Sequence, residues 1–230
     1  MCAAGAVLLL CACQPAPTRP ASPALSPAPS ASVTVPAPPT IPGDPGEGDT
    51  TAPPPPGTMS AALPPWDRAA ACGVERWAVK TGMDPAASQV NMVPVPATVA
   101  ALGAAPAPAA LGPARLPQEM RTVTVTAMLV SVKRESDSDL HLVLSVAGAT
   151  MIGEIPHPSC VASGPFRAGS ARARAALDAL VPQLARSGGF VPVGRQVTLT
   201  GVLFFDPPHK QTGKSPNGAE LHPIVSLVAR

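Results

Sequence analysis

Apolar and polar residues alternate through the second half of the chain in a pattern that predicts five strands. The stretch RTVTVTAMLVSV (121–132) is rich in β-branched residues, which favour strands. In LHLVLSV (140–146), leucine or valine occupies every second position and defines one face, and His141 lies on the other. The remaining strands are predicted over 149–155, 196–205 and 219–228, with Gly153 as a bulge and Pro223 at an edge or bulge.

The period changes between the third and fourth predicted strands. SARARAALDALVPQLAR (170–186) places Ala173, Leu177, Leu180 and Leu184 on one side at helical spacing, and Pro182 should end or kink this helix. Its apolar face is better explained by core packing than by binding to a membrane surface.

Three strands, a helix and two strands form the order of an OB-fold, a five-stranded, partly open barrel. By analogy, such a barrel binds its ligand on strands 2–3 and on the loops that follow strands 1 and 4, here 133–139 and 206–218. The predicted fold class is therefore mainly β, an OB-fold-like five-stranded barrel with one helix between strands 3 and 4. A β-sandwich fragment or an α+β roll is the competing architecture.

Composition divides the rest of the chain. Of the 33 prolines, 17 lie between Gln14 and Pro65, and this segment has too few large apolar residues to form a core. We therefore expect a disordered Pro/Ala-rich tether over 13–65, an irregular extension packed on the barrel over 66–116, and the barrel domain over 117–230. Within the extension, short helices are expected to end at Gly82 and to begin at Thr98.

The first residues, MCAAGAVLLLCACQ, contain an apolar stretch with the length of a signal-peptide core. The stretch from Leu10 to Cys13 resembles the lipobox of bacterial lipoproteins, in which the last cysteine becomes the acylated N-terminus. This resemblance implies a signal peptide over 1–12, a lipidated Cys13 and a place in the cell envelope, outside the cytoplasm. No Lys or Arg precedes the apolar stretch, and an ordinary secretory peptide is the alternative.

Two cysteines, Cys72 and Cys160, lie in the part of the chain that is expected to fold. Because an exported protein meets an oxidising compartment, we expect them to form a disulfide. A metal site built from cysteine and histidine is the alternative, and the absence of a CxxC spacing weighs against it.

The elements HLVL, GEIP, FFD and ELHP, between residues 72 and 228, resemble a group of exported bacterial proteins of uncharacterised function with an OB-like barrel. The resemblance supports the fold and implies no activity.

Charge and aromatic content limit the classes of ligand. The net charge is +2, Tyr is absent, and the chain has four Phe and two Trp. The sequence therefore argues against nucleic acid as a partner, because there is no strong positive field and aromatic stacking platforms are scarce.

Two acid-x-His pairs, Asp139/His141 and Glu220/His222, each place both side chains on one face of a strand. If the strands bring them together with Glu154 or His209, then His141, Glu220 and His222 are candidate metal ligands, and a metal-dependent hydrolase is the alternative function. A nuclease of the staphylococcal type is less well supported, because only Arg134, Asp137 and Asp139 fit it.

The segment HKQTGKSPNG offers Lys210 and Lys214 for an anion, and Asn217 and Gly218 for a chain reversal that needs no ligand. The leading hypothesis is a lipid-anchored, non-catalytic binding protein whose partner is an envelope protein, a glycan or a small ligand, with no cofactor. The residues predicted to bind are Arg134, Asp139, His141, His209, Lys210 and Asn217.

Overall fold

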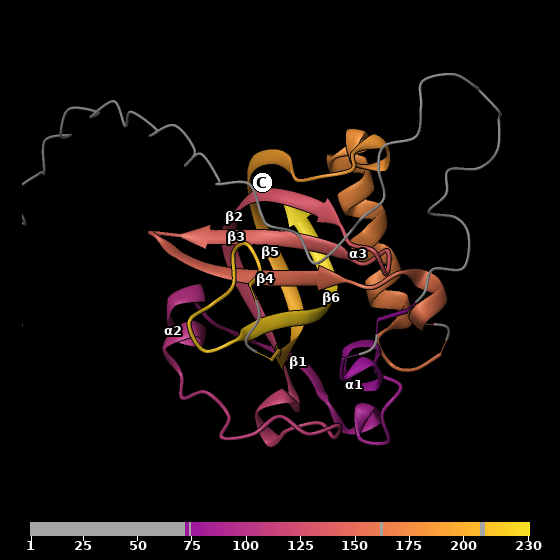
Figure 1. Ribbon diagram of the computed structural model, residues 1–230, viewed down its shortest axis with the longest axis vertical. Coiled ribbons are helices and arrows are strands. Elements are labelled where there is room, and N and C mark those ends of the chain that lie inside the picture. The colour runs from indigo at the N-terminus through magenta and orange to yellow at the C-terminus, as the bar shows by residue number, and fades with distance from the viewer. Residues whose placement is uncertain (1–71, 74, 162, 208–209) are drawn as a thin grey trace, which may run out of the picture. The chain divides into compact units, whose positions relative to one another are not determined.

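The computed structural model describes residues 72–73, 75–161, 163–207 and 210–230, which are coloured in Figure 1. The predicted signal peptide, the tether and Cys13 lie outside these residues. Within them, the strands are β1 (Asn91–Pro96), β2 (Arg121–Arg134), β3 (Leu140–Val146), β4 (Ala149–Ile155), β5 (Val191–Phe205) and β6 (Ala219–Ala229). The helices are α1 (Trp77–Thr81), α2 (Val99–Ala104) and α3 (Arg167–Leu180), with 3-10 turns at Ala87–Gln89, Pro117–Glu119, Pro158–Val161 and Pro182–Arg186. None of the described helices is long and apolar enough to cross a membrane.

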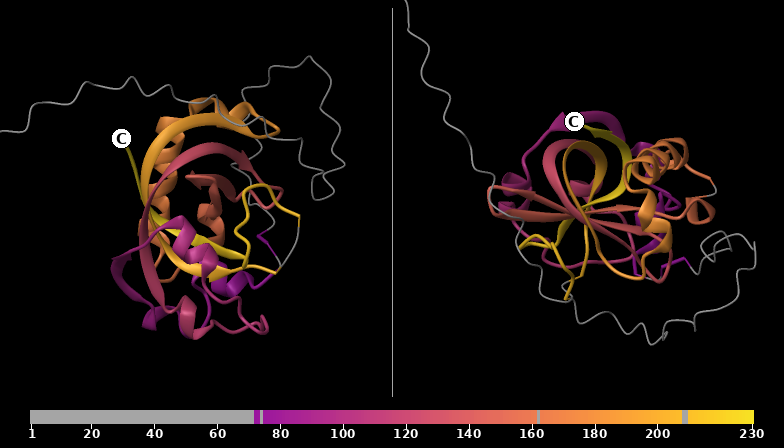
Figure 2. Two further views of the ribbon diagram at one scale, coloured as in Figure 1. Left: turned by 90° about the vertical axis from the view of Figure 1, so that its left-hand side faces the viewer. Right: turned by 90° about the horizontal axis from the view of Figure 1, so that it is seen from above.

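The described strands form one mixed sheet whose hydrogen bonds close a ring. The order is β1-β2-β3-β4-β6-β5, and β2 also pairs with β5. Figure 1 shows β3 and β4 side by side, and Figure 2 shows β2 and β5 as long curved strands. The ring is uneven, since the parallel contact of β4 with β6 has only two residue pairs, whereas β2 and β5 pair from Thr122 to Val132. The predicted mainly β class is therefore confirmed.

Alternation along the strands separates a core face from an outer face. In β3, Leu140, Leu142 and Leu144 are buried in the core, as predicted, and His141 and Val143 lie on the other face. β4 follows the same rule, because Met151 and Ile155 belong to the core and Glu154 does not. α3 contributes Ala173 and Leu177 to this core. The outer face of β3, β4 and β6 is thus where polar side chains gather.

Several element boundaries differ from the prediction. β1 was not predicted, because its sequence NMVPVP contains two prolines; it pairs in parallel with β2 alone, and all six of its residues are exposed. β5 begins at Val191 rather than at residue 196, and α3 begins at Arg167. α3 ends at Leu180, and Pro182 starts a 3-10 turn, as its missing N–H requires.

The predicted bulge at Gly153 is wrong, since the pairing of β3 with β4 runs unbroken through it. The glycine is needed for a different reason: a Cβ at this position would lie 2.7 Å from Cδ1 of Ile224 on the neighbouring β6. Gly153 therefore permits close packing of β4 against β6.

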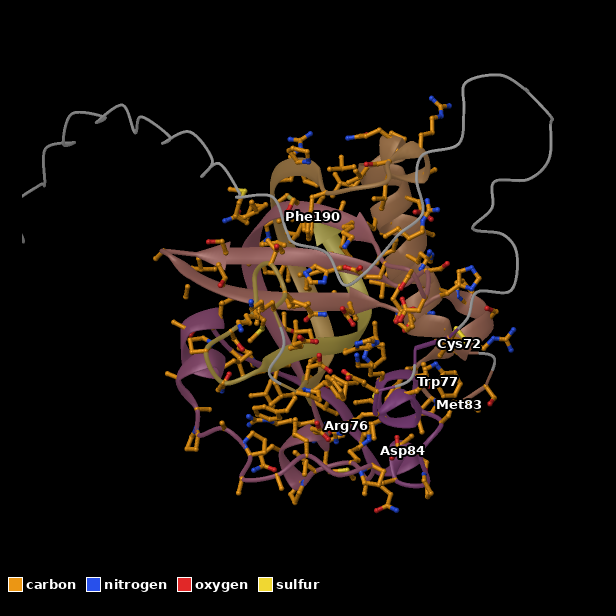
Figure 3. The ribbon with its side chains drawn as sticks, in the orientation of Figure 1. Cys72, Arg76, Trp77, Met83, Asp84 and Phe190 are labelled. Atoms are coloured by element: carbon orange, nitrogen blue, oxygen red, sulfur yellow. A yellow bond between two sulfur atoms is a disulfide. The ribbon has the colours of Figure 1, made fainter. Side chains whose placement is uncertain are left out.

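The segment around α1 is fastened by covalent and ionic links. Cys72 and Cys160 form a disulfide with a Cα–Cα distance of 5.7 Å, which confirms the predicted pair. Arg76 donates hydrogen bonds to the carboxylate of Glu119 and to the carbonyl of Phe205. Figure 3 shows Cys72, Arg76 and Asp84 gathered around α1. These links hold α1 against β5, close to the polar outer face.

Candidate functional site: a buried cluster of histidines and carboxylates

Side chains from three strands meet on the outer face of the sheet ring. His141 of β3 lies opposite Glu154 of β4, and Glu220 of β6 lies opposite Ile152 of β4. Because residues two apart share a face, Glu220 and His222 both join this group. All four side chains are buried, so the sequence places charged groups in a region that water barely reaches.

Asp139, Glu154 and His222 form the centre of the cluster. Nδ1 of His222 lies 2.7 Å from Oε2 of Glu154, and Nε2 lies 3.6 Å from Oδ2 of Asp139. One nitrogen or oxygen from each of the three residues can be chosen so that all lie within 4.8 Å of one another. The exposed fractions are 7% for Asp139, 4% for Glu154 and 0% for His222. The three residues thus form a compact, buried group of possible metal ligands.

His141 connects this centre to the loop that follows β5. Its Nε2 lies 2.9 Å from the carbonyl oxygen of Thr212, and its Nδ1 lies 3.4 Å from Glu135 and 3.5 Å from Glu154. Burial by itself lowers the pKa of His141, but the interactions with Glu154 and Glu135 outweigh burial and raise it. An imidazole that donates from Nε2 and faces two carboxylates with Nδ1 is stabilised by a proton on both nitrogens.

A lysine from α1 reaches the same cluster. Nζ of Lys80 lies 3.3 Å from Oδ1 of Asp206. Burial alone lowers the pKa of Lys80, but the negative charges of Glu154, Asp206 and Glu220 raise it above its ordinary value. The ammonium group therefore stays charged and neutralises part of the buried negative charge.

Two glutamates of the cluster, Glu154 and Glu220, have pKa values that are shifted in opposite directions. Burial by itself raises the pKa of Glu154, but His222, His141 and Lys80 hold it well below the ordinary value. Burial raises the pKa of Glu220 well above its ordinary value, and the charges of Glu154 and Asp206 add to this rise. Neighbouring buried acids, one charged and the other neutral, are typical of functional sites and also occur in structural ion-pair networks.

The predicted binding residues fall into different surroundings. Asp139 and His141 belong to the cluster, and Lys210 is exposed. Arg134 lies with Arg174 and Asp178 on the wall of a cavity of about 130 Å³ between β2 and α3. Asn217 has a structural role, because its amide donates to the carbonyls of Leu102 in α2 and of Ala105 just after that helix. His209 lies outside the described residues.

The structure brings together a different set of possible metal ligands from the predicted set. His141, Glu220 and His222 do lie on one face, but the three that share a centre are Asp139, Glu154 and His222. Lys80 and Asp206 were missed as members of the cluster. Its sequence neighbours could not have predicted this role for Lys80. Nothing in the stretch WAVKTG indicates that the lysine points toward a sheet formed by residues far away in the chain.

Comparisons with known proteins assign no family. No family model matches the chain, and no curated protein matches it. One solved structure, a protein assigned as an aspartyl-tRNA synthetase from Leishmania major Friedlin, is similar with a TM-score of 0.31 and 11% sequence identity, over 62% of this chain and 22% of that chain. This chain spans about a fifth of the length of that protein, and a likeness of this size supports no inference about fold or activity.

Asp139 makes folding stability depend on pH. Burial raises the pKa of Asp139 to about 7, with the charges of Asp137 and Glu154 adding to the rise and His222 opposing it. The folded pKa exceeds the unfolded value, so the neutral carboxyl stabilises the fold at low pH and this contribution is lost as pH rises through about 7.

Asp139→Asn is therefore expected to gain stability relative to the wild type, by about 4 kcal/mol between pH 4 and pH 8 in buffer with a chelator. Urea unfolding of both proteins across this range measures the difference. Parallel stability curves would contradict this prediction, because they would show that the pKa of Asp139 is the same in the folded and the unfolded protein.

Proposed function

We propose that the chain is a lipid-anchored, extracytoplasmic binding protein whose barrel is of the OB type and is not catalytic. The ligand binds where the loops 133–139 and 206–218 meet over the outer face of β3, β4 and β6. The tether and Cys13 hold this domain at a membrane surface.

The topology of the ring supports the OB assignment. The five strands β2, β3, β4, β6 and β5 follow one another around the ring, β4 and β6 pair in parallel, and α3 stands between β4 and β5 in sequence. These are the connections expected of an OB barrel with a helix between its third and fourth strands. β1 is an addition outside the ring.

One observation carries the proposed binding region: the two loops converge. The carbonyl of Thr212 contacts the ring of His141, which lies two residues after the loop 133–139. A Cβ on Gly213 would lie 2.7 Å from Cγ1 of Val143, so the loop 206–218 lies against the outer face of β3. In an OB barrel this is the pair of loops, and the face, that holds the ligand.

The rim of this region carries cations and an aromatic ring. Phe190, labelled in Figure 3, sets its ring edge against His141 at a centroid distance of 5.5 Å. Nζ of Lys133 lies 5.6 Å from the centre of the Phe190 ring, and Lys210 and Lys214 are exposed on the opposite loop. This combination of exposed charge and a partly exposed aromatic ring suits recognition of a polar partner.

Burial of the central cluster favours binding over hydrolysis. A catalytic metal site keeps an open coordination position for water or substrate. Asp139, Glu154 and His222 are all less than a tenth exposed, and His141 is sealed by the Thr212 carbonyl. A substrate would have to displace the loop 206–218, whereas a partner at the rim meets Lys210 without any such movement.

Photo-crosslinking in cells tests this proposal. The full chain is given a benzophenone amino acid in place of Lys210, and the matched control carries it in place of Arg121, which is exposed at the far end of the 14-residue strand β2. We expect a discrete adduct from position 210 only, on protein recovered with membranes and bearing an acylated Cys13. Equal adducts from both positions, or none, would exclude the binding region; a free N-terminal amine would exclude the anchor.

A further inference from the structure

We propose that Asp139, Glu154 and His222 form a closed site for one divalent transition-metal ion, of the Zn²⁺ or Mn²⁺ kind. The inference goes beyond the proposed function, because it requires neither the lipid anchor nor a partner at the rim. It makes the buried cluster a metal centre that joins β4 and β6 to the turn before β3.

The donor set suits such an ion. One imidazole nitrogen and two carboxylate oxygens are ligands that Zn²⁺ and Mn²⁺ accept. Two ligands that each lie ~2.1 Å from one ion are at most ~4.2 Å apart, so small side-chain movements bring three atoms that lie within 4.8 Å of one another onto a shared ion. Two carboxylate charges also neutralise a divalent ion, which lowers the cost of burying the whole group.

His222 supplies an independent observation. Its side chain is fully buried, and neither ring nitrogen makes a hydrogen bond of acceptable geometry within the described residues, even though Oε2 of Glu154 lies 2.7 Å from Nδ1. A buried polar atom without a hydrogen bond costs about 1–3 kcal/mol, and an ion is one of the usual reasons for such an atom in a native structure. Coordination through one nitrogen, with Asp139 and Glu154 moving onto the same ion, gives that nitrogen a partner.

The neighbours of the three ligands hold them in place. Oδ1 of Asp139 accepts a hydrogen bond of 2.8 Å from the backbone N–H of His157, which leaves Oδ2 to face His222. Nδ1 of His141 lies 3.5 Å from Oε1 of Glu154, and the Phe204 ring packs against His222. Outer partners of this kind orient metal ligands in known metal sites.

The number and type of the ligand atoms favour some divalent ions over others. Ca²⁺ takes six to eight oxygen ligands and Mg²⁺ keeps several waters in octahedral geometry. Two carboxylates and one imidazole offer few oxygens for Ca²⁺, and the imidazole nitrogen suits Zn²⁺ better than Ca²⁺ or Mg²⁺. We therefore expect Zn²⁺ and Mn²⁺ to bind, and Ca²⁺ to serve as a matched ion that does not.

The test uses the full chain, purified without chelator for metal analysis, then stripped and titrated with Zn²⁺, Mn²⁺ and Ca²⁺ by calorimetry. We expect about one Zn²⁺ or Mn²⁺ per chain and no Ca²⁺. Asp139→Asn, Glu154→Gln and His222→Gln should each weaken Zn²⁺ binding more than 100-fold, and His141→Gln by about 10–100-fold, as for an outer partner. Asp178→Asn, which changes an exposed carboxylate on α3 outside the cluster, is the control and should leave the affinity unchanged.

Zn²⁺ binding that survives the three ligand variants, or that falls equally in Asp178→Asn, would overturn the site, as would wild-type protein that binds neither Zn²⁺ nor Mn²⁺. If a ligand variant fails to fold, the wild type still decides: Co²⁺ in the site should give a visible absorption band that Zn²⁺ removes, and no band would contradict the proposal. The crosslinking at Lys210 does not depend on this outcome, so the two proposals fail separately.

Discussion

Replacing Cys72 and Cys160 with serine is expected to lower the free energy of unfolding by about 4–5 kcal/mol on the chain-entropy model. The disulfide joins residues 88 apart, so its loss frees a long loop in the unfolded chain. Guanidinium unfolding of the double variant and of the wild type, each with and without reductant, measures the change. Reduced wild type should match the double variant, and reductant should leave that variant unaffected.

This loss also bears on the cluster, because the disulfide fastens the segment that carries Lys80. Cys160 follows β4, the strand of Glu154, and Cys72 precedes α1 by a few residues. An unfolding free energy that is the same in oxidised and reduced wild type would show that the remaining ion pairs hold α1 by themselves.

Glu119→Ala is expected to cost about 3–5 kcal/mol, because it leaves the charge of Arg76 without its buried partner. The Glu119 carboxylate is fully buried and accepts bonds from Arg76 and from the backbone N–H groups of Leu116 and Phe205. Its removal therefore breaks four hydrogen bonds, two of them from backbone N–H groups. Urea unfolding measures the change.

The double variant Arg76→Ala/Glu119→Ala is the matched control for that prediction. If the pair acts as a unit, the cost in the double variant is clearly less than the sum of the two single costs. Additive single costs would mean that Arg76 and Glu119 stabilise the fold independently. Asp84→Ala at the separate buried pair with Arg115 offers a comparison at a second site.

The strands of the ring were readable from the sequence because each shows its own alternation. Leu140, Leu142 and Leu144 place His141 on the opposite face without any tertiary information, and the structure confirms this. β1 was not readable, because Pro94 and Pro96 argue against a strand in any sequence rule. It pairs with the first residues of β2, on an edge that β3 leaves open because β3 pairs only with Met128–Arg134.

The cluster was only partly predictable, for a physical reason. The acid-x-His spacing predicts which side chains share a face of a strand, but it does not predict which strands become neighbours. His222 was therefore grouped with Glu220 and His141, whereas its contacts in the structure are with Asp139 and Glu154. The parallel contact of β4 with β6 decides the matter by bringing Glu154 against His222. Lys80 reaches the cluster from α1, and that approach depends on long-range links such as the Cys72–Cys160 disulfide.

The metal centre is tested most directly by anomalous diffraction from crystals of the full chain grown with Zn²⁺, recorded at the zinc absorption edge. The predicted result is one strong peak ~2.0–2.2 Å from a carboxylate oxygen of Asp139, one of Glu154 and a ring nitrogen of His222. A map with no peak between these three side chains, or with zinc only at exposed residues, would contradict it.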